Sequence, residues 1–97
     1  MKIDQRAINF AVLLKMSKDK LQAQLPEMEI SNAMIGKILG FSESAAGQGF
    51  RGERTLFNIM QLNDLSQATG IELTTMVEVL DGNFPEEYKV QAKKIFE

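Results

Sequence analysis

The sequence predicts an all-α domain of five or six helices. Apolar residues recur at helical spacing along most of the 97-residue chain. Glycine and proline interrupt this pattern at intervals that leave segments of helical length, and Asp, Ser or Asn stands before several of these segments, as in helix N-caps. A chain of this length forms one hydrophobic core, so we expect a single domain.

The first and longest helix is expected over residues 4–24. Asp4 is a suitable N-cap, and Pro26 ends the helix near Gln24 because the residue before proline disfavours helix. Three lysines in its C-terminal half are either a solvated helix end or phosphate contacts: Lys15, Lys18 and Lys20. The helix has a wide apolar stripe that we assign to the core: Ala7, Ile8, Phe10, Ala11, Val12 and Leu14.

Two short helices are expected next. Ser31 is the N-cap of a helix over Asn32–Leu39, and Gly40 follows its last apolar residue. Ser42 is the N-cap of a second helix that runs to about residue 50. Gly36 removes bulk where these two helices must cross.

Two further helices follow, over Thr55–Thr69 and Leu73–Leu80, ended by Gly70 and by Asp81-Gly82. The first of them has one broad apolar face: Leu56, Ile59, Met60, Leu62, Leu65 and Ala68. The second has apolar residues at i, i+3, i+4 and i+7: Leu73, Met76, Val77 and Leu80.

A sixth helix is expected within residues 83–97, with Pro85 in its first turn and Asn83 as its cap. This segment either packs on the domain formed by residues 1–82 or pairs with its twin in a homodimer. The residues expected on its apolar side, and hence in such a dimer, are Tyr88, Ala92, Ile95 and Phe96.

Two short helices joined by a glycine-containing turn form a helix-turn-helix, whose second helix enters the DNA major groove. The run from Gly40 to Gly52, followed by Leu56, resembles the lambda repressor-like (Cro/repressor, XRE-type) helix-turn-helix DNA-binding family. Residues 70–76 resemble that family's link into its fifth helix, so the resemblance covers about residues 30–80. It implies a homodimeric transcriptional regulator of double-stranded DNA, most simply a repressor of phage or prophage type.

Base contacts are expected from the start of the helix over residues 42–50. The resemblance carries base contact to Glu43 and Ser44, and a phosphate or supporting contact to Asn32. Glutamine occupies the position of Glu43 in that family, and a glutamate there accepts a hydrogen bond from a cytosine amino group. Gln48 lies a little over one turn further on and is suited to pair with adenine.

Phosphate contacts are expected from Arg51 and Arg54 in the loop that follows, and from Lys37. The net charge of −2 opposes strong nonspecific DNA binding, but its distribution is uneven. Residues 1–20 carry net +3, residues 31–55 carry net +1, and residues 56–83 carry net −4. The alternative function is a protein-interaction module or inhibitor built on the same scaffold, which binds a protein instead of DNA.

Catalysis is not expected. The chain has no cysteine and no histidine, which removes thiol and imidazole chemistry and most metal sites. No phosphate-binding glycine loop that ends in Lys-Ser/Thr is present. We therefore expect no enzyme activity and no cofactor. Without a membrane-spanning run or a secretory signal, the expected location is cytoplasmic.

Overall fold

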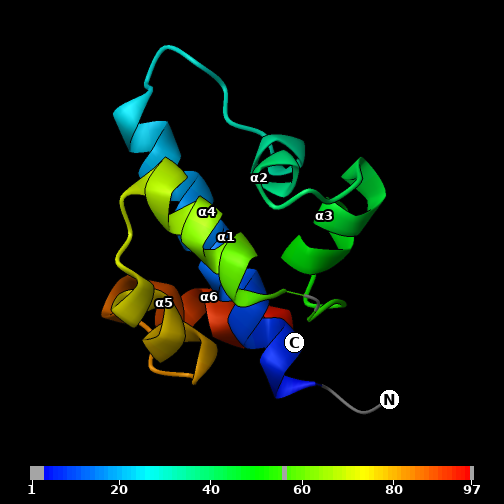
Figure 1. Cartoon of the computed structure of the whole chain (residues 1–97). Helices are drawn as coiled ribbons and strands as arrows, with labels where there is room; N and C mark the ends of the chain where they lie inside the picture. The colour runs from blue at the N-terminus through cyan, green and yellow to red at the C-terminus, as the bar shows by residue number, and fades with distance from the viewer. Residues whose placement is uncertain (1–3, 56, 97) are drawn as a thin grey trace.

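The computed structural model describes residues 4–55 and 57–96, with only the backbone for residues 91, 92 and 94–96. No β-strand occurs in these two ranges, so the predicted all-α class is confirmed. Not one of the helices seen there has the length and apolar character needed to cross a membrane. The six helices in Figure 1 are α1 (Gln5–Gln24), α2 (Asn32–Ile38), α3 (Glu43–Phe50), α4 (Ile59–Thr69), α5 (Leu73–Leu80) and α6 (Glu86–Phe96).

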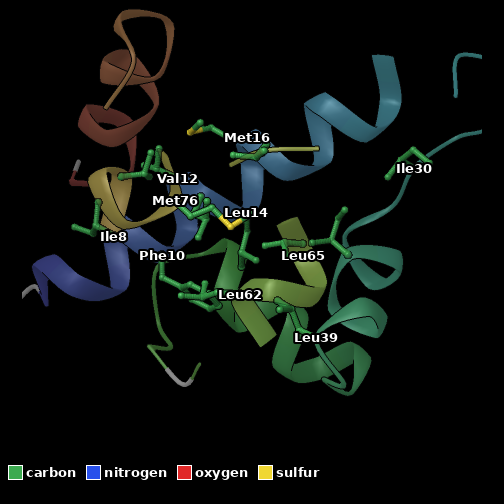
Figure 2. Packing of buried hydrophobic residues seen from close by; sticks show 14 residues of the cluster. Ile8, Phe10, Val12, Leu14, Met16, Ile30, Leu39, Leu62, Leu65 and Met76 are labelled. Atoms are coloured by element: carbon green, nitrogen blue, oxygen red, sulfur yellow. The ribbon is translucent and has the colours of Figure 1, made fainter. Parts of the chain in front are cut away.

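Helix α1 is the centre of the molecule and contacts all five other helices. Asp4 caps it, as expected, by accepting a hydrogen bond from the Arg6 backbone N–H at 3.0 Å. Every residue from Ala7 to Leu14 is buried, so this part of α1 is covered on all sides, and not along one stripe only. In Figure 2 its side chains gather with those of Leu65 and Met76 at the middle of the core.

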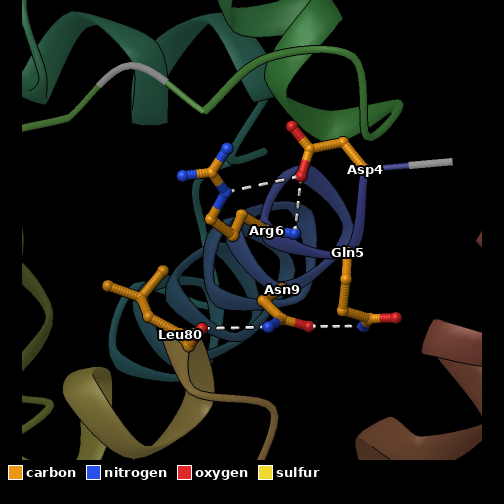
Figure 3. A network of polar contacts seen from close by, with 5 residues as sticks. All are labelled: Asp4, Gln5, Arg6, Asn9 and Leu80. Carbon is orange, nitrogen blue, oxygen red and sulfur yellow. Dashed lines mark hydrogen bonds and ion pairs between the residues drawn. The ribbon is translucent and has the colours of Figure 1, made fainter. Parts of the chain in front are cut away.

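One polar side chain is built into the packing of α1 against α5. Asn9 is 4% exposed, and its Nδ2 donates to the backbone carbonyl of Leu80 at 2.9 Å. Its Oδ1 accepts from Gln5 Nε2 at 2.8 Å (Figure 3). Because both ends of this buried amide are hydrogen-bonded, it positions the end of α5 on α1 without leaving an unsatisfied polar group.

The predicted start of the fourth helix at Thr55 is wrong. Helix α4 begins at Ile59, because Asn58 caps it and Gln61 completes a capping box: Gln61 N donates to Asn58 Oδ1 and Asn58 N donates to Gln61 Oε1, both at 2.9 Å. Leu56, expected on the apolar face, lies outside the described residues. Ile59 and Met60, also expected there, are 66% and 74% exposed, because each lies one turn before an exposed polar residue, Asn63 or Asp64, on the solvent-facing side of α4.

The C-terminal helix α6 packs against α1. It begins at Glu86, one residue after Pro85. Asn83, expected as its cap, instead donates from Nδ2 to Glu78 Oε2 at 3.2 Å. Tyr88 is half-buried on the core, and its hydroxyl donates to Asp19 Oδ2 of α1 at 2.8 Å. The part of residues 83–97 that the structure describes therefore packs on the rest of the chain through Phe84, and through α6 against α1.

Candidate nucleic-acid interface

Helices α2 and α3 are joined by a four-residue turn and pack against each other. Ser31 caps α2 by accepting from Met34 N at 3.3 Å, and Ser42 caps α3 by accepting from Ala45 N at 3.1 Å. Gly40 has a φ of 75°, a conformation that L-residues with a Cβ adopt at a cost. The Phe41 N–H then donates to the Gly36 carbonyl at 2.8 Å and closes the turn.

Close approach of the helices depends on two glycines. A Cβ on Gly36 would overlap the Cβ of Ala46, so the expected role of Gly36 at the crossing of α2 and α3 is confirmed. A Cβ on Gly49 would lie 2.8 Å from Leu14 Cδ1, so this glycine allows α3 to approach α1. With its inner face held in this way, α3 presents the opposite face to solvent at the edge of the molecule (Figure 1).

The predicted base-contacting residues differ in exposure. Glu43 and Ser44 are exposed at the start of α3. Gln48 is half-buried, and its Oε1 accepts from Arg54 Nε at 3.2 Å. Glu43 and Ser44 are therefore open to solvent, whereas Gln48 is bonded to the loop that follows α3.

The structure brings Asn32 and Glu43 together at a hollow of about 480 Å³ between α1, α2 and α3. Lys18 joins them there, because its Nζ donates to Asn32 Oδ1 at 2.9 Å and lies 5.9 Å from the centre of the Phe50 ring. The hollow is lined by Lys18, Glu29, Ile30, Ser31, Asn32, Ala33, Glu43 and Gly47. Asn32, for which a phosphate or supporting contact was expected, thus holds the ammonium group of Lys18.

Lys18 is the residue whose role the sequence left open. It follows Leu14 by four positions, so both lie on the same side of α1. Leu14 packs against Gly49 of α3, and that contact places Lys18 beside the same helix. The helical register of Lys18 was visible in the sequence, but the face of α1 that α3 covers was not.

The remaining predicted phosphate contacts lie near the end of α3, except Lys37, which is exposed on α2. Arg51 is exposed and paired with Glu53, with Nε 2.6 Å from Oε2. Arg54 is half-buried, bonded to Gln48, and its guanidinium lies 6.0 Å from the centre of the Phe41 ring. These contacts hold the two arginines close to the α3 surface.

The charges near α3 are mixed. Lys18, at the hollow, faces Glu29 and Glu43, and Arg51 is matched by Glu53. A duplex brought to this surface would meet cations at both ends of α3, with Glu29 and Glu43 near its start and Glu53 near its end. The charge of this surface by itself therefore favours only modest attraction to phosphate.

Of the predicted dimerisation residues, only the Tyr88 side chain is described, and it contacts α1 of the same chain. Burial, with the hydrogen bond to Asp19 and the charges of Asp19 and Glu87, raises the pKa of the Tyr88 hydroxyl well above its usual value. The side chains of Ala92, Ile95 and Phe96 lie outside the described residues. Dimerisation through this helix stays a prediction.

The chain matches no family model, no curated protein and no solved structure. Its class is that of a small all-α domain with a helix-turn-helix geometry in α2 and α3.

Proposed function

We propose that this chain is a sequence-specific double-stranded-DNA-binding transcriptional regulator that inserts α3 into the major groove. The observation that carries the proposal is the exposure of Glu43 and Ser44 at the start of a helix whose opposite face is packed on α1 and α2. The major groove is wide enough to admit one α-helix, and its base edges are read by side chains near the start of such a helix.

The side chains divide into two roles. Glu43 accepts from a cytosine amino group, and Ser44 bonds a neighbouring base or phosphate. Lys18, Lys37, Arg51 and Arg54 contact the phosphates on either side and set the position of the helix, with Asn32 holding Lys18. Gln48 reads an adenine only if its bond to Arg54 opens.

The regulator acts as a homodimer in the cytoplasm, without catalysis or a cofactor. Two copies related by a twofold axis match a palindromic site, and the end of α6 is the proposed contact between them. Occupancy of the operator blocks the polymerase, as in repressors of phage or prophage type.

Selection of duplexes from random DNA with the full-length chain, at two salt concentrations, tests this function. We expect enrichment of a palindrome and weaker binding at the higher salt, with a slope of log K against log salt of about −0.9 for each phosphate contact. Recovery of no motif at either concentration would contradict the proposal and favour a protein-interaction module.

Variants separate the two roles. Glu43→Gln and Ser44→Ala should change which duplexes are recovered, because they alter groups at the base edges. Arg51→Ala should weaken binding to all of them alike and reduce the magnitude of the salt slope by about 0.9. If the two kinds of variant behave identically, the assignment of roles is wrong.

A further inference from the structure

A second surface stands out on α4 and α5. The exposed fractions of Ile59, Met60 and Val77 are 66%, 74% and 55%. Half-buried Leu73 connects them: it shares a groove of about 280 Å³ with Ile59, Met60, Asn63 and Asp64, and it precedes Val77 by one helical turn. We call Ile59, Met60, Leu73 and Val77 the α4–α5 patch. Neighbouring apolar side chains exposed in this way mark interaction surfaces.

Charges of one sign accompany the patch. Asp64 lines its groove, and Asp81 follows Val77 by four positions, directly after α5. The sequence has no lysine or arginine between residues 56 and 83, where the net charge is −4. A second copy of the chain, docked patch to patch, would bring like charges together, which disfavours association. A partner that combines apolar and cationic side chains complements both features.

We propose that the α4–α5 patch docks a cationic amphipathic helix of a partner protein. Apolar side chains at i, i+3, i+4 and i+7 of that helix cover Met60, Leu73 and Val77, and its lysines or arginines lie near Asp64 and Asp81. Neither α4 nor α5 contacts α3, and Figure 1 shows α3 and α5 on different sides of α1. The docked partner leaves α3 accessible, so this inference does not depend on DNA binding.

The test uses a synthetic amphipathic helical peptide of leucine and lysine, and a matched peptide with glutamate in place of each lysine. Each is titrated into the isotopically labelled full-length chain, and binding is followed by backbone amide chemical shifts. Met60→Ala and Val77→Ala remove apolar contact area, while Asp64→Asn and Asp81→Asn remove charge. Val90→Ala is the matched control, because Val90 is 60% exposed on α6, a helix that contacts neither α4 nor α5.

We expect the lysine peptide to shift amides of α4 and α5 and to bind at least about tenfold more tightly than the glutamate peptide. Met60→Ala and Val77→Ala together should weaken it at least about tenfold, as truncation of central interface side chains does. The two Asp→Asn changes should reduce its salt dependence, and Val90→Ala should have no effect. Equal binding of both peptides, or shifts confined to other helices, would overturn the proposal. Self-association that Met60→Ala and Val77→Ala abolish would overturn it too, by identifying a second copy as the occupant.

Discussion

At the scale of single residues, the two glycines inside α3 have opposite roles. An added Cβ at Gly49 meets Leu14 in the core, whereas at Gly47 it lies 3.2 Å from the exposed end of the Arg51 side chain. That guanidinium is able to move aside. Gly49 therefore serves packing, and Gly47 lowers helix stability without a packing contact in return.

Substitution of each glycine by alanine should separate these roles. Gly47→Ala should raise the free energy of unfolding by about 0.5–1 kcal/mol, because alanine has the higher helix propensity. Gly49→Ala should lower it by about 1–3 kcal/mol, because the core must shift to accept a methyl group. Chemical denaturation of both variants measures the difference. Equal effects of the two substitutions would contradict the packing of α3 on α1.

The titration of Tyr88 reports whether α6 is packed against α1. Its raised pKa, caused by burial and by Asp19, means that folding favours the neutral phenol. The stability that this provides is fully present below the ordinary tyrosine pKa of about 10 and is lost as pH rises above it. The unfolding free energy should therefore fall above pH 10, and fall less in Tyr88→Phe.

Because Tyr88 is the only tyrosine and the chain has no tryptophan, near-ultraviolet absorbance follows its ionisation alone. The folded chain should form phenolate only at a pH above the value found in denaturant. Phenolate formation near pH 10 in the folded chain would show that Tyr88 is not held against α1 as described.

At the scale of helices, the local signals were predictable. Asp4, Ser31 and Ser42 each cap the helix assigned to them, since a cap depends on residues close by in the chain. The bounds of α5 also agree with its apolar spacing. The predicted start of α4 was wrong because the capping pair Asn58 and Gln61 outweighs the apolar pattern before Asn58.

Burial was harder to predict than helix bounds. Ile59 and Met60 are apolar and were assigned to the apolar face, but each lies with an exposed polar residue, Asn63 or Asp64, on the solvent-facing side of α4. At the candidate nucleic-acid interface, too, tertiary packing was harder to predict than helix position. Glu43 and Ser44 follow from the position of their helix, whereas Lys18 comes from a distant segment and reaches the site through tertiary packing.

The cap of α3 provides a test at this scale. Ser42→Ala should lower the free energy of unfolding by about 1 kcal/mol, because the Ala45 N–H loses its acceptor. Ser44→Ala, an exposed serine of the same helix, should change it by less than about 0.5 kcal/mol. Thermal and chemical denaturation compare the two. A larger loss in Ser44→Ala would show that Ser42 is not the cap.

At the scale of the whole molecule, α1 separates two surfaces of different character. The α3 surface combines cations with exposed glutamates, and the α4–α5 patch combines apolar side chains with aspartates. The overall charge of −2 does not indicate this difference between the two surfaces. These two surfaces are the ones that we propose for DNA and for a cationic protein segment.

The central claim, that α3 is the DNA-contacting helix, is tested most directly by amide chemical-shift mapping of the full-length chain with its selected duplex. We predict that the largest shifts fall on residues 42–51 and on Lys18 and Asn32, with α5 unaffected. Largest shifts on α5 or α6, with α3 unchanged, would contradict the claim.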